Sequence, residues 1–137
     1  MKQKLLITAA IIALLFLWGA NFASATTRDD VPRMGKEELR ENLGNPDVVI
    51  LDVRTPENWQ KGMWKIKGAV RQLPSEVDKW APELDKDKTY VLYCLRPMED
   101  TSATVGAKMI DMGFKKVYVL KGGLFPWLKA RYPAEKK

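Results

Sequence analysis

The side chain best suited to covalent chemistry in this 137-residue chain is Cys94, its single cysteine. It follows an aromatic and β-branched run, Thr89 to Tyr93, that is typical of a buried strand. A charged loop comes next, and a helical pattern begins at Ser102. Backbone N–H groups and the helix dipole at such a position favour thiolate over thiol. The spacing predicts a nucleophilic thiol between a strand and a helix.

Two absences narrow the chemistry. The chain has no histidine, which excludes Cys–His and Ser–His–Asp catalysis and every histidine-ligated metal site. A single cysteine forms no internal disulfide and no CxxC redox pair. We therefore expect neither a metal ion nor a cofactor. The alternative for Cys94 is a buried, unreactive thiol, but its position before a helix start is one where reactive thiols occur.

Residues 1–25 have the features of a secretory signal. Lys2 and Lys4 precede a long uncharged apolar run, and Ala23-Ser24-Ala25 is typical of a processing site. We expect cleavage after Ala25, a periplasmic or secreted product, and no stable membrane span after cleavage. The alternative is a retained anchor, because the apolar run is only slightly shorter than the roughly 17 to 25 residues of a span.

Charge gives little indication of a nucleic-acid partner. Loss of the two signal lysines leaves 21 basic against 17 acidic residues, so the net charge falls from +6 to +4. The lysines are scattered and form no stripe, which is typical of a solvated surface. We expect no binding to nucleic acid.

Apolar runs alternate with helical patterns along the rest of the chain. Strands are expected at 48–51, 68–73, 89–93 and 116–120, and helices at 36–43, 56–61, 75–84 in two pieces, 102–112 and 126–131. This alternation predicts an α/β fold in which helices cover both faces of a parallel sheet. We assign 26–34 to a linker, 35–133 to one domain and 134–137 to a charged tail.

Several short motifs occur together in a familiar order. They are Val48-Val49-Ile50-Leu51-Asp52-Val53-Arg54, Glu57 with Trp59, Gly68-Ala69-Val70, Val91-Leu92-Tyr93-Cys94, Ser102-Ala103, Gly113-Phe114, Leu120-Lys121-Gly122-Gly123 and Trp127. From about Met34 to Pro133, the chain resembles the rhodanese family of sulfurtransferase domains. The resemblance implies a five-stranded parallel sheet flanked by helices, with a cysteine at the tip of the central strand.

The resemblance also implies a two-step reaction. The thiolate takes the outer sulfur of a donor such as thiosulfate as a persulfide, and then passes it to an acceptor such as cyanide or a thiol. Cys94 would be the nucleophile, and Asp52 and Arg54 would support the site structurally. The substrate-binding loop would include Leu95, Arg96, Met98, Glu99, Asp100, Thr101 and Ser102. The expected partners are a small sulfur-containing substrate or a thiol acceptor, either small or carried by a protein.

The loop departs from the family pattern. Arginine is usual five residues after the cysteine, but Glu99 stands there, and the loop is about two residues longer. Glu99 and Asp100 would repel a dianionic donor, by about 1 kcal/mol per charge pair in water, and would favour a persulfide or polysulfide. Alternatively, both acids point into water at the helix N-terminus. A phosphatase of this fold needs arginine where Asp100 stands.

Two functions of different classes are consistent with these residues. The first is an exported sulfurtransferase that carries sulfane sulfur on Cys94. The second is a non-catalytic rhodanese-like module that binds a partner or captures a soft element. Measurable turnover of a sulfur donor distinguishes the first from the second.

Overall fold

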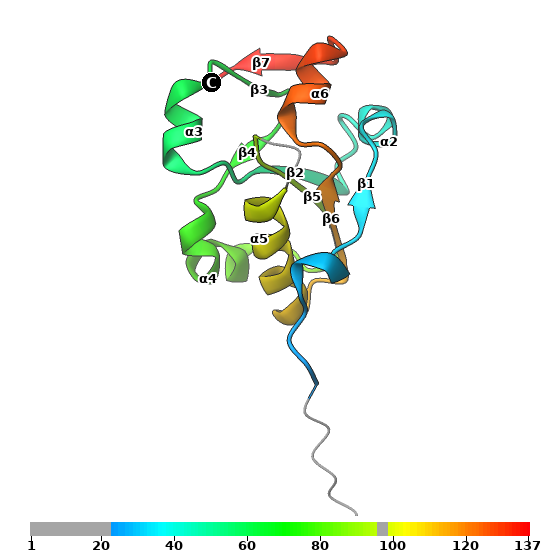
Figure 1. Ribbon diagram of the computed structural model, residues 1–137. Helices are drawn as coiled ribbons and strands as arrows, with labels where there is room; N and C mark the ends of the chain where they lie inside the picture. The colour runs from blue at the N-terminus through cyan, green and yellow to red at the C-terminus, as the bar shows by residue number, and fades with distance from the viewer. Residues whose placement is uncertain (1–22, 96–98) are drawn as a thin grey trace, which may run out of the picture.

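The computed structural model describes residues 23–95 and 99–137, and its centre is a five-stranded parallel sheet (Figure 1). The strand order is β1-β6-β5-β2-β4, with adjacent strands in parallel register. The strands of the sheet are β1 Arg33–Met34, β2 Val48–Asp52, β4 Val70–Arg71, β5 Thr89–Tyr93 and β6 Lys116–Leu120. The predicted α/β fold with a five-stranded parallel sheet is confirmed.

Helical segments connect the strands and cover the sheet. They are η1 Arg28–Asp30, α2 Lys36–Glu41, α3 Pro56–Lys61, η2 Pro74–Glu76, α4 Val77–Trp80, η3 Ala81–Glu83, α5 Asp100–Asp111 and α6 Leu124–Lys129. No helix within 23–95 or 99–137 has the length and apolar character that crossing a membrane requires.

The central strand β5 divides the core into two layers. Tyr90 and Leu92 pack on one face with residues of α4 and α5, whereas Val91 and Tyr93 pack on the other with residues of α2 and α6. Successive strand residues point to opposite faces, so a strand covered on both sides is apolar at every position. This is why the continuous apolar run predicts the strand that ends at Tyr93, directly before Cys94.

Two segments are more ordered than their sequences suggest. The expected linker 26–34 contains η1 and the edge strand β1. This strand pairs with β6, and Val31 and Met34 of the segment are buried. The expected tail 134–137 contains β7 Ala134–Lys136, which pairs antiparallel with β3 Trp64–Ile66. Both strands have three residues or fewer, so they show no hydrophobic period and are held by backbone pairing.

Candidate functional site

Cys94 lies at the carboxyl edge of the sheet, directly after β5. Because all five strands are parallel, their carboxyl ends lie at this one edge, where α/β proteins commonly bind ligands. The Cys94 residue is 7% exposed. Its carbonyl oxygen accepts a hydrogen bond from the Leu124 N–H at 3.0 Å, so the first residue of α6 fixes the backbone that carries the thiol.

Ser102 contacts the thiol from the first turn of α5. Its Oγ lies 3.4 Å from Cys94 Sγ, and the residue is fully buried. The same hydroxyl donates to the carbonyl of Glu99 at 3.1 Å. The predicted neighbours Cys94 and Ser102 are therefore together. The helix begins at Asp100, two residues before the position indicated by the sequence, so both loop acids lie at its start.

Glu99 is the loop residue held most firmly. It is 8% exposed, and its carboxylate accepts from Arg33 Nε at 2.8 Å and from the Gly122 N–H at 2.7 Å. Its backbone is left-handed, with φ of 57°, and its carbonyl accepts the Ala103 N–H. The alternative in which Glu99 points into water is wrong, because both of its carboxylate oxygens accept hydrogen bonds from other parts of the protein.

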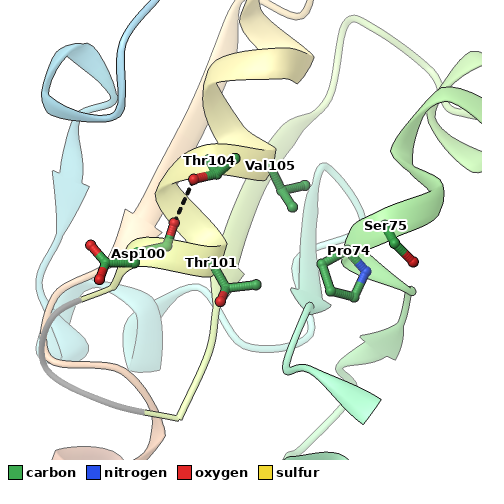
Figure 2. Close-up of a pocket in the computed structure, with 6 residues that line it drawn as sticks. All are labelled: Pro74, Ser75, Asp100, Thr101, Thr104 and Val105. Atoms are coloured by element: carbon green, nitrogen blue, oxygen red, sulfur yellow. Dashed lines mark hydrogen bonds between the residues drawn. The ribbon is translucent and has the colours of Figure 1, made fainter.

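Asp100 and Thr101 line an open pocket beside the cysteine loop. The pocket has a volume of about 320 Å³ and lies between the first turns of α5 and the segment Pro74–Ser75. Figure 2 shows Thr101 and Val105 on the side of α5 that faces Pro74. Asp100 is exposed and pairs with Arg28 at 3.0 Å. Thr104 Oγ1 donates to the Asp100 carbonyl at 2.8 Å.

Asp52 and Arg54 form a fully buried ion pair at the end of β2. Arg54 Nε donates to the Asp52 carboxylate at 2.9 Å, and Nη2 donates to the Trp64 carbonyl. The Tyr93 hydroxyl donates to Asp52 Oδ2 at 2.6 Å. These contacts agree with the structural role expected of Asp52 and Arg54. Burial, and then the charge of Asp52, raises the pKa of Tyr93 above its usual range.

Leu95 is partly buried and packs on the α2–α6 face of the core. Arg96 and Met98, the other two residues expected in the loop, lie outside the described residues.

Sequence reasoning missed two contributors at this edge. Arg33 neutralises Glu99 from a distance of 66 residues along the chain, in the segment assigned to a linker. Arg71, at the end of β4, lies with its guanidinium carbon 4.9 Å from the ring centre of Trp59. Neither arginine belongs to a local motif. The sequence places Arg71 inside the predicted strand 68–73, whereas the observed strand β4 ends at it.

Comparison with known proteins gives a consistent assignment. The rhodanese-like domain family model matches residues 35–130. Thiosulfate sulfurtransferase GlpE of Coxiella burnetii is 31% identical over 96 residues, which cover 70% of this chain and 85% of that protein. A tRNA uridine(34) hydroxylase of Acinetobacter baumannii is 30% identical over 106 residues, which cover 72% of this chain but only 32% of the hydroxylase.

A solved structure gives the same fold. The solution structure of a rhodanese-like domain from Anabaena sp. superposes with a TM-score of 0.65 at 27% sequence identity. The match covers 76% of this chain and 78% of that domain.

Proposed function

This chain belongs to the rhodanese-like domain family, and on that basis we propose that it is a sulfurtransferase that carries sulfane sulfur on Cys94. The observation that carries the proposal is the position of Cys94, at the end of the central strand and against Ser102 in the first turn of α5. A sulfur at this position receives the partial positive charge of the helix N-terminus. A relative of similar length is named a thiosulfate sulfurtransferase.

The chemistry needs one thiolate and no cofactor. Cys94 Sγ attacks the outer sulfur of thiosulfate, the sulfur–sulfur bond breaks, and sulfite leaves with the electron pair. The product is a Cys94 persulfide. An acceptor thiolate or cyanide then attacks the terminal sulfur, and Cys94 leaves as a thiolate. The Ser102 hydroxyl lies 3.4 Å from Sγ, and by turning its one proton from the Glu99 carbonyl to the sulfur it can donate a hydrogen bond to the thiolate in the resting and leaving states.

The ion pair of Glu99 with Arg33 supports an anionic donor. A bare carboxylate in the loop would repel thiosulfate, but Arg33 Nε lies 2.8 Å from Glu99 and cancels its charge at a distance. Asp100 is likewise paired with Arg28 and is more than half exposed. Glu99 and Asp100 therefore repel thiosulfate less than their positions in the sequence suggest.

The test is persulfide formation on the intact protein. The chain lacking residues 1–25 is incubated with thiosulfate, and separately with polysulfide, and its mass is measured. We expect one added sulfur atom, none in Cys94→Ser, and slower formation in Ser102→Ala. Release of the sulfur to cyanide would establish turnover. If neither donor added sulfur, or if Cys94→Ser added as much as wild type, the sulfurtransferase proposal would fail and the binding module would be preferred.

We further propose that the protein is exported, on the strength of the signal-like residues 1–25. The test is expression of the full chain in a bacterium, followed by fractionation and mass measurement. We expect a periplasmic or secreted product that begins at Thr26. An intact N-terminus in the membrane fraction would favour the retained anchor instead.

A further inference from the structure

Positive charge exceeds negative charge around Trp59, next to the carboxyl edge of the sheet. The guanidinium carbons of Arg54 and Arg71 each lie 4.9 Å from the Trp59 ring centre, and Lys137 Nζ lies 4.6 Å from it. Asp52 is the carboxylate that contacts these arginines. Among these contacts, three cations share one side-chain carboxylate.

The Asp52 carboxylate already accepts hydrogen bonds from the buried Arg54. Both oxygens of Asp52 accept from Arg54, and Oδ2 also accepts from Tyr93. Arg71 Nη1 comes no closer to Asp52 Oδ1 than 3.9 Å, and it donates instead to the backbone carbonyls of Asp52 and Gln72 at 3.1 Å. Asp52 is thus a counter-ion of both arginines, but its carboxylate accepts hydrogen bonds from Arg54 and not from Arg71.

Burial leaves the Arg71 charge poorly compensated. Its side chain is 20% exposed. Burial lowers the pKa of the Arg71 guanidinium, the nearby Asp52 carboxylate partly offsets this, and the Arg54 charge adds to it. In the described part of the chain, Arg71 donates hydrogen bonds only from Nη1. Its Nε and Nη2 groups donate no hydrogen bond within those residues.

The side-chain carboxylates of α3 and β7 are paired with lysines. Glu57 of α3 pairs with Lys61 at 2.6 Å, and Glu135 of β7 pairs with Lys65 at 2.8 Å. Each of these pairs is neutral as a unit. An incoming anion would compensate the charge of Arg71 better than the limited water that its 20% exposure admits.

Arg71 and Cys94 lie at the same carboxyl edge of the sheet, at the ends of β4 and β5. Asp52 is in register with Arg71 on one side and with Tyr93, the residue before Cys94, on the other. Two strand spacings of about 4.8 Å separate Arg71 from Tyr93. The chain that follows Arg71 reaches Pro74 and Ser75, which line the pocket at the first turn of α5 (Figure 2).

We propose that Arg71, held against Trp59, is the anion-binding residue that recruits dianionic sulfur donors such as thiosulfate to Cys94. This inference rests on the proposed sulfurtransferase function. The sulfonate oxygens accept from the Nε–H and Nη2–H groups of Arg71 as the donor enters, and the outer sulfur is the atom that Cys94 then attacks. Arg71 thereby provides a cation to a loop that lacks the arginine usual at the position of Glu99.

The first experiment compares two donors that differ by one charge. Thiosulfate carries two negative charges, and methanethiosulfonate, in which methyl replaces one sulfonate oxygen, carries one. The rate of Cys94 persulfide formation is measured with each. We expect the thiosulfate-to-methanethiosulfonate rate ratio to fall about tenfold in Arg71→Met. Lys61→Met, which removes the same charge from α3, should leave the ratio unchanged.

A second variant separates charge from packing. Arg71→Lys keeps the charge but loses the flat guanidinium with its Nε–H and Nη2–H donors, so its rate ratio should lie between those of wild type and Arg71→Met. The ratio in wild type should also fall with added salt, and this dependence should be weaker in Arg71→Met. An unchanged ratio in Arg71→Met, or a ratio in Arg71→Lys equal to that of wild type, would overturn the proposal.

The second experiment measures binding without chemistry. Thiosulfate is titrated into Cys94→Ser protein while the Arg71 Nε–H and Trp59 indole signals are followed by NMR. We expect saturable shifts that Arg71→Met abolishes. Such shifts without persulfide formation in wild type would keep the anion site and remove the sulfurtransferase function. Persulfide formation without these shifts would do the reverse, and the absence of both would overturn both proposals.

Discussion

The contacts of Glu99 hold its charged side chain and its strained backbone in place. Its left-handed backbone costs about 1 to 2 kcal/mol for a residue with a Cβ atom. The ion pair with Arg33 and the hydrogen bond from Gly122 offset that cost. Both partners come from other strands or their ends, so Glu99 fastens the end of the cysteine loop to β1 and to the turn after β6.

The first prediction concerns this contact. In Glu99→Gln the side-chain oxygen still accepts from Gly122, but the charge that pairs with Arg33 is lost. We expect the free energy of unfolding to fall by about 1 to 3 kcal/mol, because the pair is largely shielded from water. Urea unfolding measures it. Asp100→Asn, which breaks the exposed pair with Arg28, should cost less than about 1 kcal/mol, and equal losses would contradict the prediction.

The second prediction concerns Tyr93 at high pH. Its pKa is raised by burial and by Asp52, whereas an unfolded tyrosine ionises near pH 10. The folded protein therefore keeps this proton when the unfolded chain has lost it. Stability from this group is complete below about pH 10 and falls at higher pH, by up to about 1.4 kcal/mol per pH unit.

The measurement compares wild type with Tyr93→Phe. Urea unfolding between about pH 9 and pH 11 gives the slope of stability against pH for each protein. The wild-type stability should fall more steeply with pH, by up to about 1.4 kcal/mol per pH unit, which corresponds to one proton. Tyr93→Phe is also less stable at neutral pH, because Asp52 and Ile66 lose a hydrogen-bond partner. Identical slopes would show that Tyr93 ionises in the folded protein as it does in the unfolded chain.

At the scale of elements, the end of α3 is shaped around Arg54. A Cβ atom on Gly62 would lie 2.8 Å from Arg54 Nη1, which is closer than two such atoms approach. Arg54 cannot move aside easily, because Asp52 and the Trp64 carbonyl hold its guanidinium and Trp59 packs on it. The glycine lets the helix end close over the buried arginine.

The third prediction follows for Gly62→Ala. The φ of Gly62 is −89°, which alanine adopts readily, so any effect comes from the Cβ contact. We expect a loss of about 1 to 3 kcal/mol in the free energy of unfolding, as for an overpacked core. The control is Gly35→Ala, where the added atom has only a contact at 3.7 Å. A loss no larger than that of the control would show that Arg54 gives way.

The sequence predicts long elements well and short ones poorly. The strand before Cys94 and the helix after it have five and twelve residues, enough to show their periods. β1, β3 and β7 have two or three residues and form only because another strand offers backbone partners. At the site, the Cys94–Ser102 neighbours follow from local order. The partners of Glu99 and the placing of Arg71 depend on contacts distant in sequence.

At the scale of the whole molecule, the segment before β1 runs beside α5. Figure 1 shows η1 next to this helix, and residues at both ends of the helix are engaged. Arg33 and Arg28 pair with Glu99 and Asp100 at its start, and the Thr26 N–H donates to Asp111 at its last residue. The N-terminal segment thereby supplies the counter-ions for the acids beside the cysteine loop.

This arrangement gives the fourth prediction, which concerns a chain that begins at Thr26. The Thr26 N–H donates to Asp111 Oδ1 at 3.0 Å, and hydrogen bonding from the side chain and backbone of Thr26 lowers the pKa of Asp111. If Thr26 is the first residue, its nitrogen becomes an ammonium group next to a carboxylate and the C-terminus of α5. Both favour the positive charge, so the pKa of the ammonium should rise in the folded protein.

A group whose pKa is raised on folding contributes its full stabilisation below its unfolded pKa and loses it as the pH increases through the folded value. An unfolded α-amino group has a pKa of about 7.7 to 8.0. The melting temperature of the chain beginning at Thr26 should therefore fall between about pH 7 and pH 10, relative to a chain beginning at Ala23. The relative fall should disappear in Asp111→Asn, because the favourable carboxylate is gone. If both chains kept the same pH dependence, the Thr26 amine would not be paired with Asp111.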